Sequence, residues 1–237
     1  MLTLPQFELD RISRPGGPGV ADEWRNPNRV RNVSGRANLD LTWNKAQVQI
    51  NTNYIDRGTR LPQNDNNVTG LYAQARFGPG TRNRLAATGD SLLGYNQFLP
   101  TDVFQQVNRS QVQRFIGSIR PTYTPTSWLT LRSNAGMDFT SQTDDETCLN
   151  SQCTDFGTNR LGFRQATRGR NFVYTVDGSA TATWRPRSWL NSTTTGGVQW
   201  VSERFDRNGA FGENLPPGAL TVGQASIQTA DEATTVS

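Results

Sequence analysis

The clearest pattern in the chain is an alternation of apolar and polar positions over residues 33–54. Small or apolar side chains occupy the odd positions as far as Trp43 and the even positions from Ala46 onward. A period of two places successive side chains on opposite faces of a β-strand. A two-residue turn at Asn44-Lys45 would bring the apolar positions of both strands to one face. The pattern therefore predicts a β-hairpin with one dry face.

Two later segments repeat this pattern, each with a short turn near its middle. The first alternates on both sides of Pro125-Thr126-Ser127, and the second on both sides of Arg185-Pro186-Arg187-Ser188. The segments between them are rich in Gly, Pro, Asn and Asp and show no period, which is typical of loops. The predicted organisation is a loop at 1–29, hairpins at 30–55, 112–140 and 171–202, and loops at 56–111, 141–170 and 203–237.

The length of the predicted strands distinguishes a membrane barrel from a soluble fold. Each arm runs about ten residues, whereas the mean strand of a soluble protein is about five to six. About ten residues is the length that crosses a bilayer as a tilted strand. Short turns that alternate with long loops are the layout of outer-membrane barrels. We therefore predict an all-β fold, an antiparallel transmembrane β-barrel segment of about six strands in three hairpins, with short periplasmic turns and long extracellular loops.

The two faces of the predicted strands differ in charge. Every charged residue inside the strands falls on the polar face, where a watery lumen would solvate it, whereas a charge facing lipid at the midplane would cost roughly 2–4 kcal/mol. The residues predicted to face the lumen are Arg36, Asp40, Gln49, Asn51, Arg132, Asn134, Asp138 and Asp177. The residues predicted to face lipid or to form aromatic girdles are Trp43, Ile50, Leu131, Trp184 and Trp200.

The alternative fold is a soluble β-sandwich, whose strands also alternate. The apolar face is rich in Gly, Ala, Ser and Thr. Such small residues fill a packed core poorly but are acceptable against fluid lipid. This composition favours the barrel.

Composition argues against several classes of function. The chain contains no His, the commonest general base and metal ligand, and no nucleophile with a neighbouring base. We therefore predict no enzymatic activity, no cofactor and no metal site. The net charge of +4 comes from scattered Arg residues, which disfavours nucleic-acid binding. No run approaches eighteen apolar residues, so no transmembrane helix is expected.

Two features of the predicted loops could carry function. Cys148 and Cys153 are the only cysteines, and an oxidising envelope would favour a disulfide between them. Free thiols or a metal-binding thiol pair remain as alternatives. Phe205 and Phe211 could stack on a sugar in the last loop, or could pack loops against one another.

Four short segments resemble the barrel of SusC/RagA-type TonB-linked outer-membrane proteins. They are residues 113–118 (QRFIGS), 123–129 (YTPTSWL), 136–138 (GMD) and 212–218 (GENLPPG), and the likeness extends over most of the chain from about residue 30. The resemblance implies a barrel of about twenty-two strands in the cell outer membrane, closed by an N-terminal plug with a TonB box. It also implies import of oligosaccharides or peptides, with the TonB–ExbB–ExbD complex and a SusD-like surface lipoprotein as partners.

The sequence departs from that family pattern at its start. Residues 1–10 lack the basic start and apolar stretch of a signal peptide, and no plug or TonB box is recognisable. We therefore expect an internal piece of a longer receptor, because six strands alone cannot close a pore of that class. A passive porin or adhesion barrel, and a secreted β-sandwich carbohydrate-binding module, remain as alternative functions.

Overall fold

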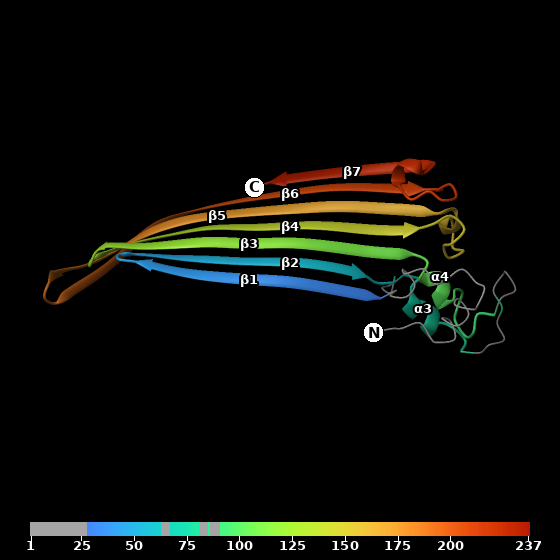
Figure 1. The fold of residues 1–237 in the computed structure, drawn as a ribbon, viewed down its shortest axis with the longest axis horizontal. Helices are drawn as coiled ribbons and strands as arrows, with labels where there is room; N and C mark the ends of the chain where they lie inside the picture. The colour runs from blue at the N-terminus through green and yellow to red at the C-terminus, as the bar shows by residue number, and fades with distance from the viewer. Residues whose placement is uncertain (1–27, 63–66, 81–84, 86–90) are drawn as a thin grey trace.

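A single antiparallel sheet, with seven strands in chain order, makes up most of the fold in the computed structural model (Figure 1). The structure describes residues 28–62, 67–80, 85 and 91–237. The predicted loop at 1–29 therefore lies almost wholly outside the described residues. The strands are β1 (Arg29–Trp43), β2 (Ala46–Arg60), β3 (Val107–Thr126), β4 (Leu129–Cys148), β5 (Phe163–Arg187), β6 (Leu190–Glu213) and β7 (Ile227–Val236).

Short turns gather at one end of the sheet and longer connections at the other (Figure 1). Two residues separate β1 from β2, β3 from β4 and β5 from β6. In the first of these turns Asn44 has a φ of 51°, a left-handed conformation that Asn tolerates better than most residues. The opposite end carries the helices α3 (Leu71–Arg76) and α4 (Pro100–Val103) and the 3-10 turns η1 (Asn159–Leu161) and η2 (Val222–Gln224).

The predicted all-β class, the antiparallel pairing and the three hairpins are confirmed. The strands are longer than predicted, because β4 continues to Cys148 and β6 to Glu213. The prediction of one loop over 203–237 was wrong for most of its length, since residues 203–213 belong to β6 and residues 227–236 form β7, which pairs with β6 from Glu213 to Arg204. Residues 214–226 connect these two strands. In these extensions both faces of the strands are polar, so the alternation that reveals a strand in the sequence is lost.

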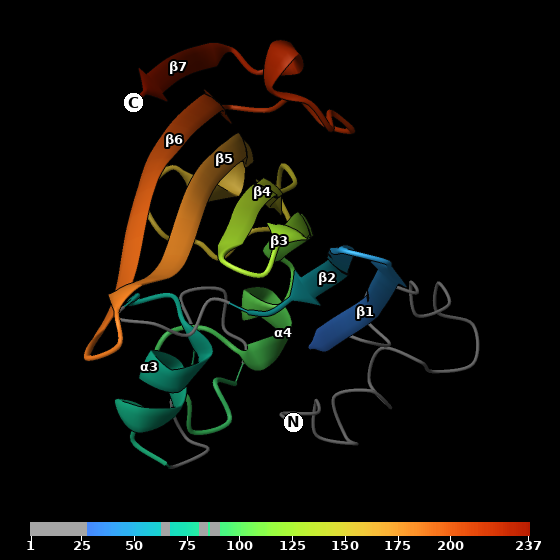
Figure 2. The same ribbon diagram turned by 90° about the vertical axis from the view of Figure 1, so that its left-hand side faces the viewer.

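The buried residues lie at the loop end rather than along the sheet. In the segment that contains α3 and α4 they include Leu92, Leu99 and Val103, and a second small cluster contains Leu215. The described part of the chain has one sheet and no second sheet packed on it, and β1 and β7 form its two open edges (Figure 2). A β-sandwich needs two packed sheets, so the structure does not favour that alternative. None of the described helices has the length and apolar character needed to span a membrane.

Candidate functional site

The register of the sheet aligns the apolar positions of six strands on one face, which we call the apolar face. Residues directly opposite one another on neighbouring strands share a face. One such row runs without a break across the first six strands, and it consists of Leu39, Ile50, Ile119, Ala135, Val176 and Trp200. Nothing in the described structure covers this face, and Trp43 is 85% exposed and Val198 80% exposed. An exposed apolar surface of this extent marks a membrane or protein interface.

On β2 to β5 the apolar face ends abruptly at a row of aromatic residues near the loop end. Tyr54, Phe115, Phe139 and Phe172 lie directly opposite one another on β2 to β5. The rings of Phe139 and Phe172 have centroids 4.6 Å apart. The next row toward the loops is polar on these strands and on β6, and it consists of Asp56, Gln113, Ser141, Arg170 and Asp206. The surface thus changes from aromatic to polar within two residues along each of the strands β2 to β5.

The loop end of the apolar band lies in one row on β2 to β5, but it is shifted on the outer strands β1 and β6. The band begins at Val33 on β1 but at Trp200 on β6, and Trp200 belongs to the row of Leu39. Leu39 lies six positions closer to the short turn than Val33. The other end of the band shifts by the same amount. On β1 the band ends at Trp43, which shares a row with Gly196 on β6. On β6 the band continues six positions further, to Leu190.

The total shift between β1 and β6 corresponds to an average tilt of the strands against the band. Averaged over the five steps from β1 to β6, the shift is about 1.2 residues per step. With a rise of about 3.3 Å per residue and a strand spacing of about 4.8 Å, the tilt is about 40°. Strands of β-barrels tilt by about 35–45° against the barrel axis. A level apolar belt around tilted strands accounts for the pattern.

The opposite face, which we call the polar face, carries a hydrogen-bonded row behind the middle of the apolar band. Arg120 donates from Nε to the Asn134 side-chain oxygen at 3.1 Å. Asn134 in turn donates to a carboxylate oxygen of Asp177 at 3.0 Å. The row extends to neighbouring strands through Gln49 and Gln199. A cation, an amide and a carboxylate are thereby held in a line across β3, β4 and β5.

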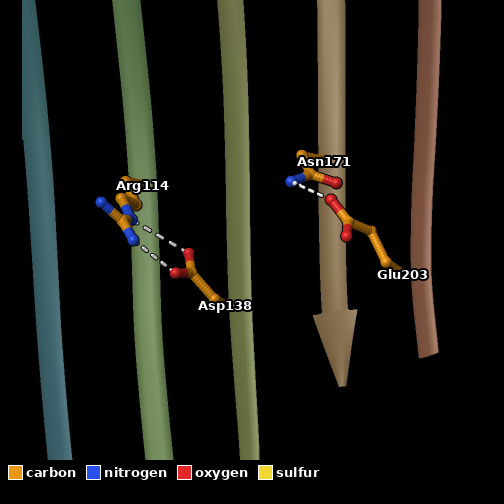
Figure 3. A network of polar contacts seen from close by, with 4 residues as sticks. All are labelled: Arg114, Asp138, Asn171 and Glu203. Carbon is orange, nitrogen blue, oxygen red and sulfur yellow. Dashed lines mark hydrogen bonds and ion pairs between the residues drawn. The ribbon is translucent and has the colours of Figure 1, made fainter. Parts of the chain in front are cut away.

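Two further polar contacts lie on this face, closer to the aromatic row than the contacts of Asn134 (Figure 3). Arg114 on β3 pairs with Asp138 on β4 through two hydrogen bonds, with Nε 3.0 Å from Oδ1. Asn171 on β5 donates to Glu203 on β6 at 3.1 Å. Each contact is diagonal, because the residue directly opposite Arg114 is Thr140 and not Asp138. These contacts leave the polar groups on one side of the sheet and extend the polar face toward the loops.

The structure places the predicted site residues of the strands on two separate faces. All eight predicted lumen residues, from Arg36 to Asp177, lie on the polar face. All five predicted lipid or girdle residues, from Trp43 to Trp200, lie on the apolar face. That one face meets lipid and the other a lumen stays a prediction.

The predicted ligand-binding role of Phe205 and Phe211 rested on placing them in the last loop, which was wrong. Both residues lie inside β6, on the polar face. The ring of Phe211 has its centroid 6.4 Å from that of Phe163 on the adjacent strand. Glu203 was missed for the same reason, because it falls in the segment predicted as a loop. Its contact with Asn171 depends on the register of β5 and β6, which continues past the alternating part of the sequence.

Cys148 and Cys153 are joined by a disulfide bond at the loop end of β4. Both are buried, and the Sγ atoms are 2.04 Å apart. The acidic residues just before Cys148 do not converge on one point. Asp145 lies on the apolar face and is paired with Arg164 at 2.8 Å, while Asp144 and Glu146 lie on the polar face.

Comparisons with known proteins support the fold. No protein-family model matches the sequence, and no curated protein matches it. The fold is similar to solved structures of the RagAB peptide transporter (TM-score 0.63, 15% identity), of the RagAB peptide importer in its closed-closed state (0.61, 16%) and of the importer in its open-open state (0.62, 16%). Each match covers 89% of this chain and 25% of the other, so this chain spans about a quarter of the length of those proteins. These neighbours are transporters, and the chain shares the fold of a part of them.

Proposed function

We propose that this chain forms part of the barrel wall of an outer-membrane transporter, with its short turns in the periplasm and its long loops outside the cell. In this arrangement the apolar face contacts the lipid core, and the aromatic row lies toward the outer interface. The polar face, with Arg120, Asn134 and Asp177, lines the lumen. The chain itself performs no chemistry; it supplies one section of a wall that further strands complete at the open edges of β1 and β7.

The single observation that carries the proposal is the apolar band, shifted between β1 and β6, opposite a continuous polar row. A soluble sheet buries its apolar face against another layer, and its apolar positions follow the packing of that layer. A barrel wall instead presents a level belt about 25 Å tall to lipid, whatever the tilt of its strands. The shift between Val33 on β1 and Trp200 on β6 fits such a belt. Charged residues inside the band, such as Asp40 and Asp177, lie on the other face.

The type of transport follows from two independent lines of support. The sequence resembles the barrel of SusC/RagA-type TonB-linked proteins, and the fold resembles structures described as a peptide importer. We therefore propose energised import through a TonB-dependent receptor, with peptides as the first substrate class to test and oligosaccharides as the second. The proposed partners are the TonB–ExbB–ExbD complex and a SusD-like lipoprotein over the loop end.

The test uses the full-length protein that contains this chain. We expect it in the outer-membrane fraction, resistant to alkaline extraction, and migrating faster on gel electrophoresis when unheated than when boiled. Uptake of labelled peptides should require an intact TonB. A protein that is soluble without detergent would contradict the barrel. Passage of small solutes in reconstituted vesicles without TonB would favour the passive porin over the importer.

A further inference from the structure

Above the aromatic row, which means between this row and the loop end of the sheet, the apolar face becomes strongly basic. The polar face does not. Above this row the described strand residues of the apolar face include seven arginines and four acidic residues. The arginines are Arg29, Arg31, Arg60, Arg109, Arg164, Arg168 and Arg170, and the acids are Asp56, Asp145, Asp206 and Glu232. At the same height the polar face has three arginines and four acids, which are Arg57, Arg114, Arg207, Asp144, Glu146, Glu213 and Asp231. The excess of positive charge is thus confined to the side that we assign to lipid.

Ion pairs neutralise part of this charge and leave a distinct site on β5. Arg31 pairs with Asp56 at 3.4 Å, and Arg164 pairs with Asp145 at 2.8 Å. Asp206 pairs at 2.9 Å with Arg204, which lies directly opposite Phe172. Arg168 and Arg170 are both exposed, and neither side chain forms an ion pair within the described part of the chain.

Hydroxyl groups lie beside these two arginines at the same height. Ser141 is directly opposite Arg170, and Thr143 is directly opposite Arg168. We call these four residues the basic strip. Two guanidinium groups with two neighbouring hydroxyls offer charge-assisted and neutral hydrogen-bond donors, the chemistry that binds phosphate.

The floor of the basic strip is aromatic. Phe139 and Phe172 lie two residues below Ser141 and Arg170 on the same face, with their rings 4.6 Å apart. Beside the strip, Thr143 also lines a groove of about 680 Å³ whose other walls include Arg29, Arg31 and Arg109. A ligand that fills this surface carries anionic groups directly above an apolar portion.

We propose that the basic strip binds phosphate groups of phosphorylated glycolipids in the outer leaflet of the membrane. This inference rests on the proposed function, since the strip faces that leaflet only if the apolar face meets lipid and the loops lie outside. Arg168 and Arg170 contact the headgroup phosphates, and the acyl chains lie along the aromatic row and the apolar band beneath. The contact anchors the barrel wall at a fixed depth and gives it a preference for lipids with phosphorylated headgroups.

The test measures lipid binding by the purified full-length protein in a non-ionic detergent. The probes are bis-phosphorylated lipid A, its monophosphorylated derivative and inorganic phosphate. We expect the lipids to bind in the order of their phosphate number, inorganic phosphate to bind at least tenfold more weakly than lipid A, and added salt to weaken lipid binding. The double variant Arg168→Gln/Arg170→Gln should bind lipid A at least tenfold more weakly, while Arg168→Lys/Arg170→Lys should retain most of the affinity.

The matched control is Arg185→Gln/Arg187→Gln, which removes the same charge from exposed arginines at the short-turn end of β5. This control should bind lipid A as the unmodified protein does. Equal binding by the Arg168→Gln/Arg170→Gln variant, equal loss in the control, or equal binding of inorganic phosphate would overturn the inference. If the Arg168→Gln/Arg170→Gln variant fails to insert, two measurements on the unmodified protein test the inference: the effect of salt on lipid binding, and the order in which lipids of different phosphate number bind. A protein found outside the membrane fraction would refute the proposed function instead.

Discussion

Phe139 and Phe172 lie directly opposite one another on β4 and β5, with ring centroids 4.6 Å apart and ring planes inclined by 32°. An aromatic pair in this arrangement contributes about 0.5–1.5 kcal/mol beyond the apolar area that it buries. The double-mutant cycle Phe139→Leu, Phe172→Leu should therefore give a coupling of this size. Equilibrium unfolding of the full-length protein in detergent or vesicles measures the coupling. A coupling within error of zero would mean that the two rings act independently in the membrane.

The assignment of the two faces predicts opposite effects at adjacent positions of β2. Ile50 belongs to the middle row of the apolar face, so Ile50→Arg should cost roughly 2–4 kcal/mol and reduce the amount of protein inserted in the membrane. Asn51→Arg, on the polar face, should be tolerated. Asn51 is a better control than Gln49, because Gln49 lies opposite Arg120 and a second cation there would add repulsion. Equal insertion of the two variants, measured in outer-membrane fractions, would show that the faces are wrongly assigned.

The ion pair between Arg114 and Asp138 should make a small, salt-dependent contribution to stability. The two side chains are 44% and 30% exposed, and exposed ion pairs typically contribute about 0.2–1 kcal/mol. A double-mutant cycle with Arg114→Gln and Asp138→Asn should give a coupling in this range that shrinks as salt is added. The cycle between Arg114 and Glu203, which lie on non-adjacent strands, serves as the control and should show none. A coupling that is independent of salt would indicate a dry environment rather than a water-filled lumen.

The sequence alone was sufficient to predict the strand segments that carry the apolar band. Alternation between a dry and a wet face, together with short turns such as Asn44-Lys45, is local information that predicts each hairpin. It was not sufficient above the band, where residues such as Arg204 and Glu203 make both faces polar. The strand β7 was missed for this reason. The contacts of Arg114 and Asn171 could not be predicted from the sequence either, because they depend on the register between strands.

The disulfide between Cys148 and Cys153 should stabilise the loop that follows β4 without affecting the sheet. Closing so short a loop stabilises it by about 2 kcal/mol in the chain-entropy description. A reducing agent should accelerate hydrogen exchange in residues 149–162 by roughly tenfold or more, while exchange in β3 and β4 is unchanged. In the Cys148→Ser/Cys153→Ser variant the same residues should exchange at the faster rate, and the reducing agent should not change that rate. If reductant leaves the unmodified loop unaffected, neighbouring contacts and not the disulfide hold it.

Gln74 organises the loop between β2 and β3, a role that its sequence position does not reveal. Its side chain is fully buried, donates to the carbonyl of Val68 and accepts from the backbone N–H groups of Gln97 at 2.7 Å and Phe98 at 2.9 Å. Gln74→Leu would leave these backbone groups buried without partners, at about 1–3 kcal/mol for each. We expect rapid proteolysis between residues 67 and 106 while the strands stay protected. The control is Gln105→Leu, at a half-buried residue whose side chain makes no hydrogen bond in the described structure. This variant should be cleaved at the rate of the unmodified protein. Equal cleavage rates for Gln74→Leu and Gln105→Leu would show that apolar packing alone maintains the loop.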